Sequence, residues 1–477
     1  LSGVYAEMES IPLYSPYQYR GGCKIYTYMD SQMQDYAENL KTDADRSGKS
    51  MLICDNRTHG IIAWYTTEGD IRRQPGSVIK PLAVYAPAVE ENKISPCTPL
   101  SDEKTDFGGY SPSNYKDEYR GYVSAREALA LSLNIPAVKI LNSLGVEKSE
   151  SFLRRMQLFL PEADKNLSLA LGGMSEGFTL REIAAAYSTF ANSGNFAPVS
   201  FIRRIEDADG NTLYTRSSTQ QKVFSEDTAA LMNEMLACAA KKGTAKKMAC
   251  LPFEVCAKTG TCGTDEGNTD AWTVSYTTAH TVAVWMGNAD NTLTDITGGG
   301  LPCHYAMLLN KRLYRNTRPQ PFTSSPKVVE CRLDKIAYEQ DHSVKLAAEN
   351  TPVRYTFTDL FRISNQPKEF GSTFTAPSVS AKIHYKNSAV FIDLCQAEYY
   401  DYVIKREQNG KTIQIYDGHC DNGYEDDTVL PNKKYTYTVT PYYLGEDGKR
   451  HYGKEITLPS VYCKQTKQSP PKNWWNS

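Results

Sequence analysis

Residues 75–89 have the sequence PGSVIKPLAVYAPAV, in which Ser77 and Lys80 stand three positions apart at the start of a long apolar run. The run predicts a helix, and residues three apart on a helix share one face, with β-carbons about 5–6 Å apart. The Lys80 amine would then reach the Ser77 hydroxyl and could take its proton. The free N–H groups at the start of the helix would also favour negative charge that develops near Ser77. This stretch therefore predicts a serine nucleophile with a lysine base.

The Ser-x-x-Lys spacing alone is not specific. A helix-capping serine followed by a solvated lysine gives the same pattern. The setting distinguishes Ser77, because it follows Pro75-Gly76 and opens the apolar run. The same spacing recurs at Ser101/Lys104, Ser113/Lys116, Ser324/Lys327 and Ser469/Lys472.

A second group of polar residues lies in a tight connection between two predicted helices. The first helix begins with a capping box at Ser124, and the second has Pro136 in its first turn and ends at Gly145. Ser132 and Asn134 lie between them, where alternate side chains can point into one cleft. A hydroxyl there can pass a proton to a leaving amine, and an amide can hold a carbonyl. The alternative is that both residues only satisfy the backbone of a turn.

A third group is the run Lys258-Thr259-Gly260-Thr261, which lies on a predicted strand. The two-residue period of a strand places Thr259 and Thr261 on one face, where two hydroxyls can bind a carboxylate. Gly260 leaves room for an extended peptide to approach the backbone. The alternative is an ordinary strand with a lysine that extends to solvent.

Length and composition limit the class of protein. A chain of 477 residues exceeds the size of one core, so we expect two or three domains. The net charge of −2, with both signs interspersed, leaves no basic stripe for nucleic acid. Because paired CxxC clusters are missing, we expect no metal site, and we expect no cofactor. The even number of cysteines, 12, permits disulfides, but no particular bridge is predicted.

The chain contains no apolar run of 18 residues and no signal segment, and it begins at Leu1. We therefore expect any membrane anchor to lie upstream of this sequence.

The order of strand-like and helical patterns predicts an α+β fold: an antiparallel sheet flanked by helices, an all-helical part, and a small β-sandwich after it. The predicted division is a linker remnant at 1–20, the α+β domain at 21–320, a connecting segment at 321–376, the sandwich at 377–465 and a flexible tail at 466–477.

The three motifs occur in the order Ser-x-x-Lys, Ser-x-Asn, Lys-Thr-Gly, and together they resemble penicillin-binding proteins and serine β-lactamases. Longer stretches narrow the resemblance to class A penicillin-binding proteins over about residues 21–315. They are GGCKIYTYMD, FGGYSPSNY, REALALSLNIPAVKIL, LALGGMSEGFTLREIAAAYSTFANSG, AKTGT and DAWTVSYTTAHTVAVWMGN. Cys256 and Cys262 depart from the usual pattern beside the Lys-Thr-Gly strand, and Cys262 is either reactive or simply packed.

The resemblance implies catalytic roles for four residues. Ser77 would attack the carbonyl between two terminal D-alanines of a peptidoglycan stem, and Lys80 would be its base. Lys80 would have to be neutral near pH 7, which burial and the positive charge of Lys258 could bring about. Ser132 would relay a proton to the departing amine.

The resemblance also implies how a substrate is held. Asn134 would bind the substrate amide, and Thr259 and Thr261, on either side of Gly260, would bind the terminal carboxylate. The backbone N–H groups of Ser77 and Thr261 would form an oxyanion hole.

The implied activity is a D,D-transpeptidase that joins a D-Ala-D-Ala donor to an amine acceptor and is acylated by β-lactams. If water attacks the ester instead, the protein is a D,D-carboxypeptidase or a β-lactamase. A non-catalytic protein that senses penicillin or binds cell wall is a third hypothesis. The resemblance implies that the chain lies on the cell-wall side of the plasma membrane. In this family a glycosyltransferase domain precedes the transpeptidase domain in the sequence, and residues 1–20 are too short to form one.

The predicted C-terminal sandwich resembles a fibronectin type III module. Leu430-Pro431 with Tyr435 is similar to the tyrosine corner of that module.

Overall fold

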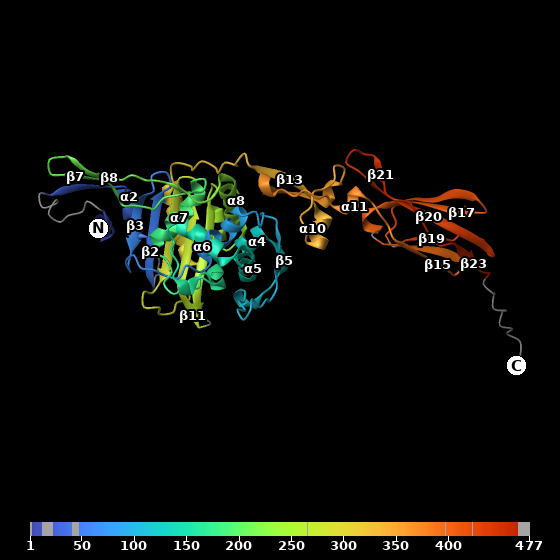
Figure 1. Cartoon of the computed structure of the whole chain (residues 1–477), viewed down its shortest axis with the longest axis horizontal. Coiled ribbons are helices and arrows are strands. Elements are labelled where there is room, and N and C mark those ends of the chain that lie inside the picture. The colour runs from blue at the N-terminus through green and yellow to red at the C-terminus, as the bar shows by residue number, and fades with distance from the viewer. Residues whose placement is uncertain are drawn as a thin grey trace. The chain divides into compact units, whose positions relative to one another are not determined.

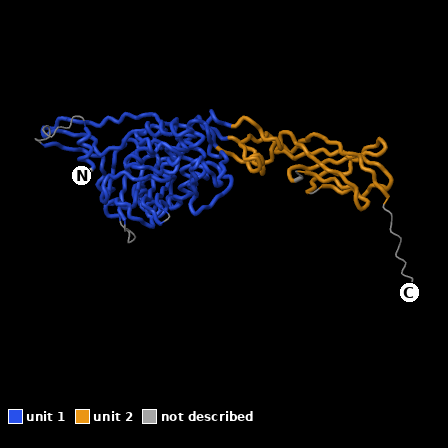
Figure 2. Tube along the Cα trace, turned by 60° about the horizontal axis from the view of Figure 1, so that its bottom comes forward, with its two compact units in different colours: residues 1–330, 360–366 blue, residues 331–359, 367–477 orange. Residues whose placement is uncertain are grey.

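A computed structural model describes residues 2–11, 22–40, 47–264, 266–395, 397–421 and 423–465. The chain forms two compact units, shown in different colours in Figure 2: residues 1–330 with 360–366, and residues 331–359 with 367–477. The domain limits predicted at residues 320 and 376 remain predictions. No helix in the described part of the chain is long and apolar enough to cross a membrane.

The first unit is built on a five-stranded sheet in which every neighbouring pair is antiparallel. Among the described strands, β10 pairs only with β11, so it forms one edge of this sheet. In spatial order the strands are β10 Cys256–Thr264, β11 Gly267–Tyr276, β12 His280–Gly287, β2 Gly48–Asp55 and β3 Gly60–Thr66.

Both faces of this sheet are buried. Alternate residues of β12 belong to two different cores: Val284 packs on one side and Trp285 on the other. The core with Trp285 includes helices α5 (Asn134–Leu144), α6 (Val146–Arg155), α7 (Leu180–Ala191) and α8 (Glu226–Lys242), which Figure 1 labels. The other core includes residues of α2 (Ser31–Asn39) and α9 (Leu301–Leu313). Burial on both faces explains why these strands have nearly continuous apolar sequences. The predicted α+β class, with helices flanking an antiparallel sheet, is confirmed.

The helices of the first unit have the following bounds: α1 Ser2–Ser10, α2 Ser31–Asn39, α3 Ala86–Glu90, α4 Ala125–Ala130, α5 Asn134–Leu144, α6 Val146–Arg155, α7 Leu180–Ala191, α8 Glu226–Lys242 and α9 Leu301–Leu313. Smaller ladders join β1 Cys23–Thr27, β7 Ile202–Asp207 and β8 Thr212–Thr215; β4 Pro99–Asp102 and β5 Gly121–Ser124; and β6 Asn195–Phe196 and β9 Gln221–Lys222. Short helical turns are η3 Tyr115–Asp117, η4 Glu162–Asp164, η5 Leu167–Leu171 and η6 Lys246–Cys250.

The helix predicted to start at Ser77 is not a regular α-helix. It consists of a 3₁₀ turn, η1 (Gly76–Ile79), a π-helical segment, η2 (Pro81–Tyr85), and α3. Pro81 explains the break, because it has no N–H to donate and its ring clashes with the carbonyl four residues earlier, that of Ser77. The hydrogen-bonding register therefore changes at Lys80, whose N–H bonds to the Ser77 carbonyl.

The predicted connection between two helices is present, with two corrections: Asn134 is the first residue of α5 rather than part of the connection, and the complete capping box lies elsewhere. Helix α5 begins at Asn134 and is followed by Gly145, whose φ of 92° is unfavourable for other residues. Ser124 precedes α4, and its hydroxyl accepts from the backbone N–H of Glu127 at 3.1 Å. A complete capping box, with both reciprocal bonds, is found instead at Thr179, before α7.

The N-terminal segment differs from the linker expected there. Residues 2–10 form α1, and its Glu7 carboxylate accepts hydrogen bonds from the backbone N–H groups of Phe201, at 2.7 Å, and Ile202, at 3.3 Å. The rest of the predicted linker and the predicted tail at 466–477 lie outside the described residues.

The second unit contains two sheets that share one core. The three-stranded sheet consists of β15 Ala381–Lys386, β16 Ala389–Leu394 and β19 Tyr424–Asp426. The six-stranded sheet consists of β17 Asp401–Gln408, β18 Lys411–Gly418, β20 Lys433–Leu444, β21 Arg450–Tyr452, β22 Ile456–Thr457 and β23 Val461–Cys463. Ile392 of β16 and Tyr402 and Tyr437 of the larger sheet are buried together in that core.

Tyr435 forms a local bond at the start of β20. Its ring is buried, and its hydroxyl accepts from the backbone N–H of Leu430 at 2.9 Å.

The division between the units passes through a two-stranded ladder, β13 (Val328–Asp334) and β14 (Thr356–Arg362). The short helices that follow its strands in the sequence are α10 Lys335–Asp341, η7 Val353–Tyr355, η8 Ile363–Asn365, α11 Ser372–Thr375 and, further on, η9 Ala397–Tyr399.

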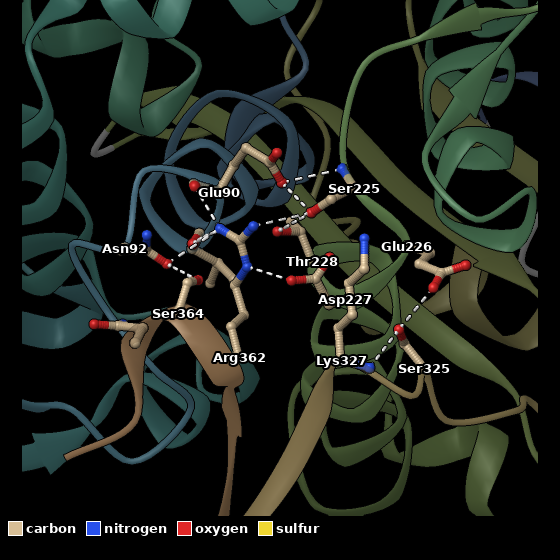
Figure 3. Close-up of polar contacts among 12 residues, drawn as sticks. Glu90, Asn92, Ser225, Glu226, Asp227, Thr228, Ser325, Lys327, Arg362 and Ser364 are labelled. Atoms are coloured by element: carbon tan, nitrogen blue, oxygen red, sulfur yellow. Dashed lines mark hydrogen bonds and ion pairs between the residues drawn. The ribbon is translucent and has the colours of Figure 1, made fainter. Parts of the chain in front are cut away.

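Residues 360–366 belong to the first unit, and Arg362 anchors them there (Figure 3). Its Nε atom donates to Asp227 at 2.7 Å, and its other nitrogens reach the Val89 and Glu90 carbonyls and the Ser225 hydroxyl. The two charged side chains are only 11% and 6% exposed. Burial alone would raise the pKa of Asp227, but the hydrogen bond from Arg362 holds that pKa below its ordinary value.

Replacing Arg362 with methionine should destabilise the first unit, because it leaves the buried Asp227 carboxylate without its positive partner. Removing one partner of a buried ion pair typically costs about 3–5 kcal/mol. The free energy of unfolding from denaturant titration measures the loss. The matched control is Arg57→Met, at an exposed arginine between β2 and β3. Equal unfolding free energies for the two variants would contradict the anchoring role.

Candidate active site

The structure brings together residues from three separate segments. Lys80, between η1 and η2, lies against the turn between α4 and α5, and its Nζ atom donates to the Ser132 carbonyl at 2.7 Å and to the Asn134 Oδ1 atom at 2.7 Å. Lys258 of β10 approaches the same turn, and its Nζ atom donates to the Ser132 hydroxyl at 2.8 Å. Ser77 stands one helical turn before Lys80, partly exposed. Hydrogen bonds therefore bring together four of the residues predicted from sequence, Lys80, Ser132, Asn134 and Lys258, and Ser77 lies three residues before Lys80.

Lys80 is completely buried, with all its polar contacts on one turn of chain. A third acceptor, the Leu133 carbonyl, lies 3.0 Å from its Nζ atom. Burial is the main cause that lowers the pKa of Lys80 well below its ordinary 10.5; the charge of Lys258 lowers it further, and Asp102 opposes this. No hydrogen bond joins Lys80 to the Ser77 hydroxyl among the described contacts. A neutral amine has two N–H groups and one lone pair, so Lys80 must give up one of its three acceptors to accept a proton from Ser77.

Lys258 is the second buried amine. It is 0% exposed, and its Nζ atom donates to the Thr259 carbonyl at 2.9 Å as well as to Ser132. Burial lowers its pKa to about 7. A group with that pKa can hold or release a proton near neutral pH, which suits an acid–base role.

Ser132 occupies a strained position between the two amines. Its φ of 62° lies in the left-handed region, which costs a non-glycine residue of order 1–3 kcal/mol. This conformation lets its hydroxyl meet Lys258 while its carbonyl meets Lys80. The Ser-x-Asn motif predicted the residue but not this backbone geometry.

Two glycines allow η1 to pack directly on β10. Gly76 has a φ of 52°, and a Cβ atom there would lie 2.8 Å from the Cys262 sulfur. A Cβ atom at Gly260 would lie 2.5 Å from the Pro75 carbonyl oxygen. The missing side chain of Gly260 therefore makes room for the loop that carries Ser77. Its predicted contact with a substrate remains a prediction.

Thr259 and Thr261 point away from the face that carries Lys258, as strand alternation requires. The Thr259 hydroxyl donates to the Thr244 hydroxyl at 2.6 Å, and the Thr261 hydroxyl accepts from the Gly298 N–H at 3.0 Å. Thr261 is exposed. Thr244 was missed by the sequence analysis, because a threonine after a helix carries no signal of its own.

Both cysteines beside the Lys-Thr-Gly run are packed. The Cys256 thiol is buried and donates to the Asn233 carbonyl, and the Cys262 thiol donates to the Gln74 carbonyl at 3.4 Å. Burial raises the pKa of each thiol. A raised pKa suppresses the reactive thiolate, so the structure favours the packing role for Cys262.

A polar pocket of about 390 Å³ is lined by Gln74, which precedes the Ser77 loop, and by Gly263 of β10. Its wall includes the buried ion pair between Arg73 and Asp270, whose Nε and Oδ1 atoms are 2.6 Å apart. The remaining lining residues are Arg72, Ser175, Glu176, Thr264, Thr269 and Asn291.

Comparison with known proteins defines the class. Residues 34–300 match the family described as penicillin binding protein transpeptidase domain. This is more than half of the chain, so the chain belongs to that family.

Sequence similarity to individual penicillin-binding proteins supports this assignment. Penicillin-binding protein 1F of Bacillus subtilis is 38% identical over 288 residues, which are 56% of this chain and 40% of that protein. Penicillin-binding protein 1A/1B of the same organism is 28% identical over 487 residues, which are 92% of this chain and 52% of that protein. The chain thus spans about half the length of these curated relatives, or less.

Solved structures share the fold. The PonA1 protein of Mycobacterium tuberculosis in complex with penicillin V has a TM-score of 0.60 and 22% identity, over 68% of this chain and 94% of that chain. Penicillin-binding protein 1A of Haemophilus influenzae has a TM-score of 0.58 and 20% identity, over 68% of this chain and 54% of that chain.

The low pKa of Lys258 should make stability depend on pH. Between pH 7 and 10.5 the folded chain has released a proton that the unfolded chain still binds, so the free energy of unfolding rises with pH. The expected slope from this one group is about 1.4 kcal/mol per pH unit. Denaturant titrations of the wild type and Lys258→Met over this range should give a difference that grows with pH. Parallel curves would contradict the low pKa.

Proposed function

We propose that this chain is the D,D-transpeptidase part of a class A penicillin-binding protein and forms an acyl-enzyme on Ser77. The observation that carries the proposal is the pair of buried amines, Lys80 and Lys258, which both donate to Ser132, with Ser77 three residues before Lys80 in the chain. The membership of residues 34–300 in the transpeptidase family supports it.

Acylation would begin when neutral Lys80 takes the proton from the Ser77 hydroxyl. The Ser77 oxygen then attacks the carbonyl between the two terminal D-alanines, and the N–H groups of Ser77 and Thr261 bind the oxyanion. The carbon–nitrogen bond breaks as Ser132 gives its proton to the leaving amine, and Lys258 gives one to Ser132. The 2.8 Å contact and the pKa of Lys258 support this relay. The products are D-alanine and a Ser77 ester.

The donor peptide would bind along the outer edge of β10. An edge strand can hydrogen-bond with an added extended chain, and Thr261 is exposed there. Thr259 and Thr261 would bind the terminal carboxylate, and Asn134, whose Nδ2 atom now donates to the Ser113 carbonyl, would hold the substrate amide.

The second half of the reaction decides the activity. In a transpeptidase the amine of a neighbouring stem attacks the ester, whereas water attacks in a carboxypeptidase or a β-lactamase. The names of the curated relatives favour a slowly hydrolysed penicillin adduct over rapid turnover. Because its substrate is cell-wall peptidoglycan, the chain would act on the extracytoplasmic side of the membrane.

A fluorescent penicillin should label the wild type covalently, and Ser77→Ala should carry no label. The matched control is Ser324→Ala, because Ser324 and Lys327 have the same spacing outside the cleft. Intact-protein mass spectrometry measures the adduct and its lifetime. Labelling that survives in Ser77→Ala would defeat the proposal, and release of the adduct within seconds would favour a β-lactamase.

We further propose that the C-terminal sandwich is a fibronectin type III module. The bond from the Leu430 N–H to the buried Tyr435 hydroxyl supports this, because a tyrosine corner makes the same kind of contact.

Tyr435→Phe should lower the free energy of unfolding of the second unit by about 1 kcal/mol, the usual net contribution of one hydrogen bond. Tyr462→Phe, at a tyrosine that is 51% exposed, is the control. Denaturant titration followed by tyrosine fluorescence measures both. The tyrosine-corner assignment fails if the two substitutions have the same effect.

A further inference from the structure

The stretch FGGYSPSNY has no role in the reaction described so far, yet its Asn114 is almost fully buried. The Asn114 side chain lies behind the catalytic turn. Its Oδ1 atom accepts from the backbone N–H groups of Asn134, at 2.8 Å, and Ile135, at 3.3 Å. These are the first two residues of α5, and Leu133, which precedes them, provides no side-chain cap. Asn114 therefore caps α5 from a distant segment.

Asp102, the last residue of β4, fixes the orientation of Asn114. It is 0% exposed, and its Oδ1 atom accepts from Asn114 Nδ2 at 2.6 Å, while its Oδ2 atom accepts from the Arg120 N–H at 3.1 Å. A carboxylate can only accept hydrogen bonds, so it must face the NH₂ end of the Asn114 amide. The oxygen of Asn114 is then directed to α5.

Hydrogen bonds connect Asn114 to Lys80 through Asn134. Asn134, whose backbone is held by Asn114, presents its Oδ1 atom to Lys80 at 2.7 Å. The Ser132 and Leu133 carbonyls, in the turn just before α5, accept from the same amine. Asp102 thus acts on the position of Lys80 through Asn114 and Asn134.

Asp102 also supplies negative charge to a cleft with two buried amines. The charged groups that act on Lys80 are Lys258 of β10 and Asp102 of β4. Lys139 of α5 donates to the Ser101 carbonyl beside Asp102. The Tyr85 hydroxyl is also buried near Asp102, and burial raises its pKa, so it stays neutral.

We propose that Asp102 is a positioning residue for the transpeptidase site, orienting Asn114 so that it holds the Ser132–Asn134 turn against Lys80. The inference deepens the proposed function and rests on it. Asp102 touches no reacting atom, so it would change the rate of acylation only through the residues it holds. Because its negative charge also acts on Lys80, its effect should appear in the pH profile of acylation as well.

The test is the second-order rate constant of acylation by a fluorescent penicillin, measured from about pH 5 to 10. Asp102→Asn should lower the rate constant about tenfold at its optimum, because the Asn114 orientation is no longer enforced. Without the negative charge, protonated Lys80 is less stable. The acid limb should therefore move to lower pH by about half a unit or more.

Two further variants separate positioning from charge. Asn114→Ser keeps the Asp102 charge, so it should lower the rate constant and leave the acid limb where it is in the wild type. Asp117→Asn makes the same chemical change at an exposed carboxylate of the same segment, and it should match the wild type in both. If Asp102→Asn does not fold, Asn114→Ser carries the test, and a wild-type rate constant for it would overturn the proposal.

The remaining outcomes are decisive. If Asp102→Asn behaves like Asp117→Asn, or if it lowers the rate without moving the acid limb, the inference fails and the proposed function stands. If the wild type is not acylated at all, both fail.

Discussion

Two lysine amines, those of Lys80 and Lys258, are buried, and both donate hydrogen bonds to Ser132. Burying an ammonium group is costly, and the cost grows when a second one lies nearby. Hydrogen bonds to oxygen atoms offset this cost: the Lys80 amine donates to three acceptors, and the Lys258 amine donates to two. The same burial lowers the pKa of both amines, that of Lys80 well below its ordinary value and that of Lys258 to about 7. The rest of the first unit can be understood as the framework that holds this pair in place.

That framework depends on close backbone contacts. Gly76 and Gly260 let the Ser77 loop rest on β10, and Pro81 interrupts the helix so that η1 stays a short 3₁₀ turn. Behind the turn between α4 and α5, the buried pair Asp102 and Asn114 fixes the start of α5. The five-stranded sheet, buried on both faces, keeps β10 at its edge, where a peptide can be added.

The sequence predicted the fold class, because strand and helix periodicities are local signals, and it predicted the approach of Lys80 and Lys258 to Ser132 through the resemblance of the three motifs taken together. It did not predict the left-handed φ of Ser132. That backbone conformation depends on the contact between Ser132 and Lys258, which are 126 residues apart in the sequence. Nor did it predict the helix at residues 2–10, whose amphipathic pattern is weak and which depends on contacts between Glu7 and residues near Phe201. The close approach of Gly260 to the Pro75 carbonyl was not predicted either, because these two residues are distant in sequence.

The central claim is that burial lowers the pKa of Lys80, so that its amine can act as the base for Ser77. The most direct measurement is an NMR titration of the Lys80 side-chain nitrogen in the unacylated protein, assigned with Lys80→Arg. The account predicts that Lys80 loses its proton well below the ordinary lysine pKa of 10.5. If Lys80 remains an ammonium up to that pH, the chain has no base for Ser77 and the account is wrong.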